Sequence, residues 1–230
     1  MGLILSLETA TAVCSVALAR DGELLALREV NEVYSHSENI TLFIGEVMKE
    51  AGLKLRDLDA VAVSCGPGSY TGLRIGVSTA KGICYALDKP LVAVPTLRAM
   101  AEGFGNSLSK QDADGMVFFV PMIDARRMEV YCSVVDNKLN ELEPTRAEIV
   151  VESSFSKYVE KGKTYFFGDG ANKCKSVIRH ANAIFANDFF PSAAFLAPIA
   201  DEKFTNGELE NLALFEPFYL KDFVPGLKKA

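Results

Sequence analysis

One segment of this chain, residues 60–87, restricts the possible fold more than any other. Residues 60–65 read Ala-Val-Ala-Val-Ser-Cys, a short apolar run typical of a strand that is buried on both faces. The run leads directly into a glycine-rich turn at residues 66–72, and apolar residues then recur at helical spacing up to Leu87. A buried strand followed by a glycine turn and a helix is typical of an α/β protein.

The glycine-rich turn, with Gly66, Pro67, Gly68 and Gly72, has two interpretations. Glycines let a backbone approach a phosphate, and a helix N-terminus offers free N–H groups to an anion. Alternatively, these glycines only permit a tight turn and close packing of the helix. A Walker loop is excluded because the turn ends in Thr-Gly-Leu instead of Gly-Lys-Ser/Thr, and a dinucleotide fingerprint is excluded because Thr71 stands where its third glycine belongs.

The rest of the first half predicts strands followed by a helix. Apolar runs within residues 3–27 predict three antiparallel strands. Ser35 and Glu38 form a capping box that predicts a helix starting at about His36.

The second half repeats the outline of the first. A polar, turn-rich stretch at 105–115 indicates a boundary, so we expect an N-terminal lobe of residues 1–104 and a C-terminal lobe of residues 105–230. We expect late helices near 192–204 and 208–215, and the last helix could return to the first lobe.

Charge and composition exclude several classes of function. The net charge of −6 argues against direct binding to nucleic acid, which needs a basic surface. Five cysteines without a C-x-x-C pair indicate reduced thiols, and two distant histidines, His36 and His180, are too few for the usual zinc sites. There is no apolar run of about 18 residues and no secretory signal, so we expect a cytoplasmic protein that does not enter a membrane.

Several motifs accompany the glycine-rich turn in a fixed order along the chain. They are His36-Ser37-Glu38, the extended turn 66–76, Ala80-Lys81-Gly82, Pro95-Thr96-Leu97, Asp124-Ala125-Arg126, Gly168-Asp169-Gly170-Ala171 and Pro217-Phe218-Tyr219-Leu220. Together they closely resemble the TsaB (YeaZ) family of bacterial tRNA threonylcarbamoyladenosine biosynthesis proteins, which belongs to the glycoprotease-like group. The resemblance spans nearly the whole chain.

The resemblance implies a two-lobed actin-like ATPase (RNase H-like) fold, shared with sugar kinases and heat-shock ATPases, in which each lobe is a mixed sheet flanked by helices. It also implies a protein without catalytic residues or a metal. The catalytic relative TsaD carries a His-Leu-Glu-Gly-His metal motif where this chain has residues 96–100, Thr-Leu-Arg-Ala-Met.

The same comparison implies that the nucleotide elements have been lost in part. Phosphate-binding hairpins of this superfamily carry an aspartate and a glycine turn, whereas this chain has Glu8-Thr9-Ala10-Thr11 in the first hairpin and Asp124-Ala125-Arg126-Arg127 in the second. The loop Gly168, Asp169 and Gly170 keeps the form of an adenosine-side loop. We therefore expect no required cofactor, with weak binding of ATP or ADP at that loop.

The function implied is that of a non-catalytic scaffold subunit that binds and activates TsaD. TsaD transfers a threonylcarbamoyl group to the tRNA adenosine next to the anticodon. Expected partners are TsaD and the ATPase TsaE, with a homodimer when the protein is alone and tRNA contacted only indirectly. The expected partner interface comprises His36, Ile40, Phe43, Ile44, Val47 and Arg74. Two alternatives stay open: a glycoprotease-like peptidase or other hydrolase, and a small-molecule kinase of the same superfamily.

Overall fold

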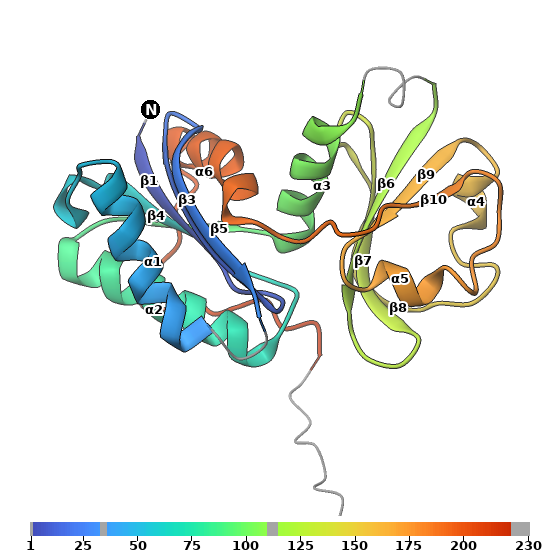
Figure 1. The fold of residues 1–230 in the computed structure, drawn as a ribbon, viewed down its shortest axis with the longest axis horizontal. Coiled ribbons are helices and arrows are strands. Elements are labelled where there is room, and N and C mark those ends of the chain that lie inside the picture. Colours follow the sequence, from blue (N-terminus) through green and yellow to red (C-terminus); the bar gives the residue numbers. More distant parts are fainter. Residues whose placement is uncertain (1, 33–35, 110–114, 222–230) are drawn as a thin grey trace, which may run out of the picture.

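A computed structural model of the 230-residue chain describes residues 2–32, 36–109 and 115–221, which form two lobes, each built on one five-stranded sheet (Figure 1). Ser35 of the expected capping box lies outside the described residues. The first sheet has the order β3-β2-β1-β4-β5. Its strands are β1 (Leu3–Glu8), β2 (Val13–Arg20), β3 (Glu23–Asn31), β4 (Ala60–Ser64) and β5 (Leu91–Val94).

The second sheet repeats this topology strand for strand. Its order is β10-β9-β6-β7-β8. Its strands are β6 (Val117–Asp124), β7 (Glu129–Asp136), β8 (Glu141–Ile149), β9 (Lys163–Phe167) and β10 (Ala183–Phe185). In both sheets three antiparallel strands are followed by two parallel ones. The expected α/β fold of two actin-like lobes is therefore confirmed.

Six α-helices and two 3₁₀ turns flank the sheets within the described residues. They are α1 (His36–Glu50), α2 (Tyr70–Leu87), α3 (Thr96–Ser107), α4 (Ser156–Val159), α5 (Ala171–Cys174), α6 (Leu196–Thr205), η1 (Leu55–Asp57) and η2 (Ala193–Phe195). The expected helix at 208–215 is wrong. The Asn211 side chain accepts hydrogen bonds from the N–H groups of Ala213 and Leu214, each at 3.1 Å, so this segment forms a local turn instead.

The helices do not cover the sheets in chain order. On the first sheet, α1 and α2 pack on one face, and α6 packs on the other, against Ile4, Ala62 and Val92 (Figure 1). Helix α3 belongs to the first half of the sequence, yet it packs on the second sheet, where the Phe104 ring stacks on Phe167 with 4.0 Å between centroids. The lobes thus exchange one helix each relative to a division at residue 104.

The burial of strands β1, β2 and β3 follows their positions in the first sheet. All six residues of β1 are buried, as expected for a central strand covered on both faces. Strand β3 is mostly exposed and lies at the sheet edge. Its neighbour β2 is buried until Arg20. Among the residues that the structure describes, no helix has both the length and the apolar character needed to cross a membrane.

The chain crosses between the lobes twice, and both crossings are fixed by hydrogen bonds. At the first, the Thr96 N–H donates to the Gly66 carbonyl at 3.0 Å, and the Gly66 N–H donates to the Thr96 hydroxyl at 3.2 Å. At the second, the Ser192 hydroxyl donates to Glu29 at 2.7 Å and the Ala193 N–H donates to Ser15 at 2.9 Å. Both connecting segments are therefore bonded to the first lobe at Gly66, Glu29 and Ser15.

Candidate functional site

A cavity of about 900 Å³ lies where the two lobes face each other. It is lined by the turn after β1, the start of α1 at His36 and Ser37, the N-terminal turn of α2, the turn after β6, the loop before α5 and residues 218–221. In chain position, the turns after β1 and β6 are equivalent in the two sheets. This cavity is the candidate functional site, because it gathers the glycine-rich turn and both altered hairpins.

The glycines of the helix turn are used for packing within the chain. A Cβ on Gly72 would overlap the Thr9 carbonyl oxygen, and one on Gly68 would lie 2.7 Å from the Ala10 Cβ. Gly76 likewise meets the Thr9 hydroxyl, which itself donates to the Gly72 carbonyl at 2.8 Å. Of the two interpretations of this turn, close packing of α2 on the first hairpin accounts for these glycines.

Gly66 has a different neighbour, the C-terminal part of the chain. Its φ of +112° favours glycine, and a Cβ there would lie 2.6 Å from the Phe218 carbonyl oxygen. The Phe218 N–H donates to the Cys65 carbonyl at 2.7 Å. The glycine-rich turn is therefore covered by residues far away in sequence.

The acidic residue of the first hairpin, Glu8, is fully buried. Its Oε1 accepts a hydrogen bond of 2.6 Å from the Ala10 N–H, while its Oε2 has no hydrogen-bond partner among the described residues. Burial is the largest cause and raises the pKa of Glu8 to about 7, although the hydrogen bond from the Ala10 N–H lowers it. A carboxyl group held inside the lobe in this way has no access to a ligand in the cleft.

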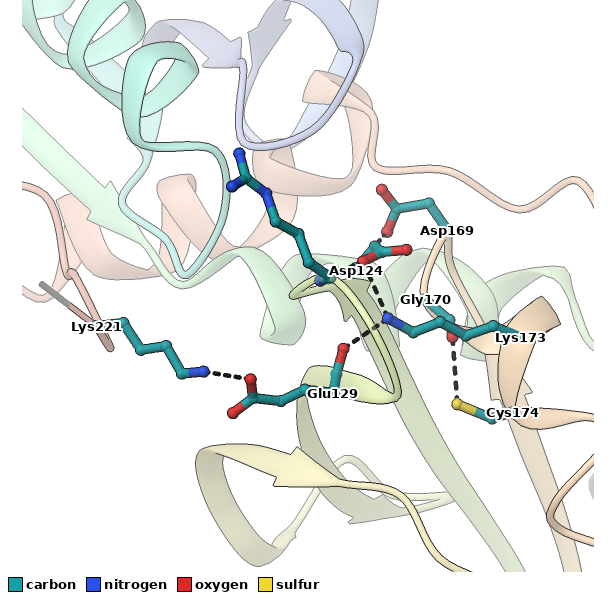
Figure 2. Close-up of polar contacts among 8 residues, drawn as sticks. Asp124, Glu129, Asp169, Gly170, Lys173, Cys174 and Lys221 are labelled. Atoms are coloured by element: carbon teal, nitrogen blue, oxygen red, sulfur yellow. Dashed lines mark hydrogen bonds and ion pairs between the residues drawn. The ribbon is translucent and has the colours of Figure 1, made fainter. Parts of the chain in front are cut away.

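The acidic residue of the second hairpin, Asp124, is exposed, but its carboxylate is already paired with a lysine of the same chain. The Lys173 ammonium donates to Asp124 at 2.9 Å and to the Glu129 carbonyl at 2.6 Å (Figure 2). The Asp124 carboxylate also accepts the Arg126 N–H at 2.5 Å, which holds the turn at Arg126 and Arg127 in left-handed conformations with φ of 70° and 50°. A turn built this way places side chains where nucleotide-binding relatives are expected to have glycine.

The loop before α5 is likewise explained by packing. A Cβ on Gly170 would lie 2.8 Å from the Ile123 carbonyl carbon, and one on Gly168 would overlap the Met122 carbonyl oxygen. Asp169 accepts a hydrogen bond of 3.0 Å from the Asp124 N–H, and burial is the main cause that raises the pKa of Asp169. Weak nucleotide binding at this loop stays a prediction.

The donor set around the cleft does not fit a divalent metal with its phosphates. Glu8 is enclosed, Asp124 is paired with Lys173, and the described residues contain no group of three or more His, Cys, Asp or Glu side chains able to hold a metal ion. Thr96, which the resemblance described above places at the first histidine of the TsaD metal motif, is buried and bonded to Gly66. We therefore derive no chemical step through a bound metal.

An activated nucleophile is also missing among the described residues. Burial raises the pKa of the Cys65 thiol to about 11, so its position at a strand end does not produce a reactive thiolate. The His36 Nε2 contacts the Thr11 carbonyl at 2.7 Å, and the His180 Nδ1 accepts the Asn182 N–H at 3.2 Å. No observation on these residues favours the peptidase alternative.

The expected interface residues fall into two groups. His36, Ile40, Ile44 and Val47 are buried inside the first lobe, the last three within its core, because helical spacing marks the face of α1 that packs on the sheet. In the chain alone these four side chains are not exposed, and their contact with a partner stays a prediction. Phe43 is partly buried and Arg74 is exposed, so both are accessible, and contact with a partner stays a prediction.

Several residues that shape this region were missed in the sequence analysis. Lys173 comes from an element 49 residues away from Asp124, and Tyr219 packs on Tyr70 with ring centroids 4.9 Å apart. Leu42 is 55% exposed on α1, opposite the buried face. Periodicity could have found Leu42, because it lies outside the apolar stripe, whereas the other two contacts depend on the tertiary fold.

Comparisons with known proteins agree along the chain. The family model described as TsaD, tRNA N6-adenosine threonylcarbamoyltransferase, matches residues 32–222. The chain is similar to the tRNA threonylcarbamoyladenosine biosynthesis protein TsaB of Escherichia coli, with 30% identity over 227 residues, 96% of this chain and 95% of that one. TsaB of Haemophilus influenzae is 37% identical over 132 residues, 57% of this chain and 53% of that one.

Solved structures give the same result. YeaZ from Pseudomonas aeruginosa superposes with a TM-score of 0.79 at 25% identity, covering 96% of this chain and 100% of that chain. A second structure, described as an uncharacterized protein with similarity to peptidase YeaZ from Pseudomonas aeruginosa, has a TM-score of 0.83 at 24% identity. The match covers 96% of this chain and 100% of that chain, and it supports the fold. Because the Escherichia coli relative matches nearly the whole of both chains and the TsaD model covers most of this one, the chain belongs to the TsaB (YeaZ) family.

Proposed function

We propose that this chain is a non-catalytic subunit that binds and activates TsaD for threonylcarbamoyl transfer to the tRNA adenosine next to the anticodon. The observation that carries the proposal is the state of the two equivalent acidic positions: Glu8 is enclosed in the core and Asp124 is neutralised by Lys173. The full-length similarity to a protein named for threonylcarbamoyladenosine biosynthesis supports the pathway. A chain that keeps the fold while Glu8 and Asp124 are not available to a ligand is suited to binding a partner.

The outer surface of α1 and α2 is the proposed partner face. The two helices contact each other on the side of the first sheet away from α6 (Figure 1). Leu42 is 55% and Tyr85 is 85% exposed, and such large apolar side chains on adjacent helices mark interaction surfaces. Gly45 and Gly82 have open space where a Cβ would stand, which lets another helix approach closely.

The proposed face has Arg74 at one end. Arg74 is exposed, and its guanidinium donates to the Tyr70 hydroxyl at 2.9 Å while lying 5.0 Å from the Tyr70 ring centre. A guanidinium held in this way presents its remaining donors in a fixed orientation, suited to a carboxylate on a partner. Four further expectations stay predictions. They are binding of TsaE, formation of a homodimer by this chain when TsaD is absent, indirect contact with tRNA, and a cytoplasmic location.

The test substitutes an exposed residue of this face. Leu42→Glu places a charge in the proposed interface without disturbing the core, and we expect its affinity for TsaD to fall at least about tenfold. Leu24→Glu is the matched control, because Leu24 is 47% exposed on edge strand β3 and lies outside this face. Calorimetric titration with TsaD measures both variants, and circular dichroism verifies that each is folded.

Activity provides the second measurement. Threonylcarbamoyl transfer to tRNA is reconstituted from TsaD, TsaE, tRNA and a threonylcarbamoyl-adenylate source, with this chain present, absent or replaced by Leu42→Glu. We expect transfer to depend on the wild-type chain and on Leu42. Full transfer without this chain would refute the proposed function, while equal affinities of the Leu42 and Leu24 variants would refute only the assignment of the face.

A further inference from the structure

Residues 216–221, here called the C-terminal strap, lie against the first lobe at several points. The Phe218 N–H donates to the Cys65 carbonyl at 2.7 Å, and the backbone of Phe218 lies where any side chain on Gly66 would stand. Just before the strap, the Lys81 ammonium of α2 donates to the Phe215 carbonyl at 2.9 Å. The strap therefore follows a fixed path along the glycine-rich turn.

The strap then reaches the second lobe. Lys221 forms an ion pair with Glu129, the first residue of β7, as Figure 2 shows. Strap residues 218–221 line the cavity between the lobes together with residues of both hairpin turns. A segment bonded to the first lobe at Phe218 and to the second at Lys221 spans the mouth of the cleft.

Between these two attachments, the strap contacts the start of α2. The Tyr219 ring packs on the Tyr70 ring with centroids 4.9 Å apart and an interplanar angle of 36°. Tyr70 in turn accepts the hydrogen bond from Arg74 described above, and its ring faces the guanidinium. A continuous chain of contacts thus joins Glu129 of the second lobe to Arg74 through Lys221, Tyr219 and Tyr70.

We propose that the C-terminal strap is a latch that holds the cleft closed and, by the same contacts, fixes Arg74 at the end of the partner face. The strap's role in orienting Arg74 for a partner rests on the function proposed above, whereas its role in closing the cleft is a property of this chain alone. Release of Lys221 removes the bond to the second lobe. Release of Tyr219 removes its ring contact with Tyr70, the residue on which the Arg74 guanidinium packs.

Hydrogen exchange of the full chain tests the latch. The reporters are the Phe218 amide, bonded to Cys65, and the amides of Gly72 and Leu73, bonded to Ser69. We expect exchange at these amides to become about two- to fivefold faster in Lys221→Glu. In Tyr219→Ala we expect it to become about three- to tenfold faster. The double variant Lys221→Glu with Glu129→Lys should restore the wild-type rate, because it rebuilds the pair with exchanged charges.

Lys203→Glu is the matched control. Lys203 pairs with Glu208 at 3.3 Å within the first lobe and does not belong to the strap. Wild-type exchange rates at the reporters in both Lys221→Glu and Tyr219→Ala, or an equal acceleration in Lys203→Glu, would overturn the latch.

Affinity for TsaD tests whether the strap orients Arg74 for a partner. We expect Tyr219→Ala to bind TsaD several-fold more weakly than wild type with Arg74 unchanged, and Lys203→Glu to bind as wild type does. Unchanged affinity in a variant with accelerated exchange would overturn the link to Arg74. Failure of wild-type protein to bind TsaD would refute the proposed function while leaving the exchange result to decide the latch.

Discussion

The buried carboxyl of Glu8 makes the stability of this protein depend on pH in a calculable way. In the unfolded chain its pKa is close to the ordinary 4.5, and burial raises it to about 7 in the fold. The folded state therefore keeps a proton that the unfolded state releases between these pH values. The contribution of this bound proton to the free energy of unfolding is complete below about pH 4.5, declines as the pH rises, and is lost above about pH 7.

The magnitude follows from the size of the pKa shift. A shift from 4.5 to about 7 corresponds to about 3 kcal/mol, of which about 2–3 kcal/mol falls between pH 5 and pH 8. Glu8→Gln keeps the shape and the hydrogen bond from Ala10 but has no proton to lose. We therefore expect Glu8→Gln to gain about 2–3 kcal/mol relative to wild type as the pH rises from 5 to 8.

Urea unfolding followed by circular dichroism at several pH values measures this difference. Glu23→Gln is the control, because Glu23 is exposed at the start of β3, and it should follow the wild-type profile. Parallel pH profiles for wild type and Glu8→Gln would refute the reasoning. They would mean that the carboxyl is charged inside the fold or reaches solvent.

Two further substitutions, one of them with a matched control, test the packing of the lobes by urea unfolding. Gly72→Ala should destabilise the fold by about 2–4 kcal/mol because its Cβ overlaps the Thr9 backbone. Its control, Gly82→Ala, has open space around the new Cβ and should be neutral or stabilising by up to about 1 kcal/mol; equal effects of the two would contradict the packing interpretation. Phe104→Ala should cost about 3–5 kcal/mol because Phe104 stacks on Phe167 under α3, and a loss below about 1 kcal/mol would show that α3 is not part of the second core.

Much of the fold could be predicted from local patterns. The first three strands follow from their apolar runs, and α2 follows from helical spacing after the glycine-rich turn; in the structure the Ser69 side chain at the start of α2 accepts the Gly72 N–H at 3.3 Å. The packing of α3 on the second sheet could not be predicted, because an amphipathic helix indicates that it packs on a sheet without indicating which one. Phe104 fits either lobe by sequence, and only the fold brings it to Phe167.

The sequence alone could not decide between the interpretations of the candidate site, for a physical reason. Helical spacing at Ile40, Ile44 and Val47 identifies an apolar face, but the same spacing describes a face turned to the sheet and one turned to a partner. Glycine turns have the same ambiguity, since close packing and phosphate binding both need a small residue at Gly72. Motif resemblance identified the family, whereas burial decided which residues are accessible.

The exchange of helices between the lobes also has a consequence for synthesis on the ribosome. Strands β1, β4 and β5 are complete by residue 94, but the helix that covers one of their faces, α6, is made about a hundred residues later. At ordinary rates of translation this delay is roughly 5–20 s, during which Ile4, Ala62 and Val92 lack the cover of α6. The nascent first lobe is therefore expected to depend on chaperones during this interval. All strands of the second sheet are synthesised before α6 completes the first lobe.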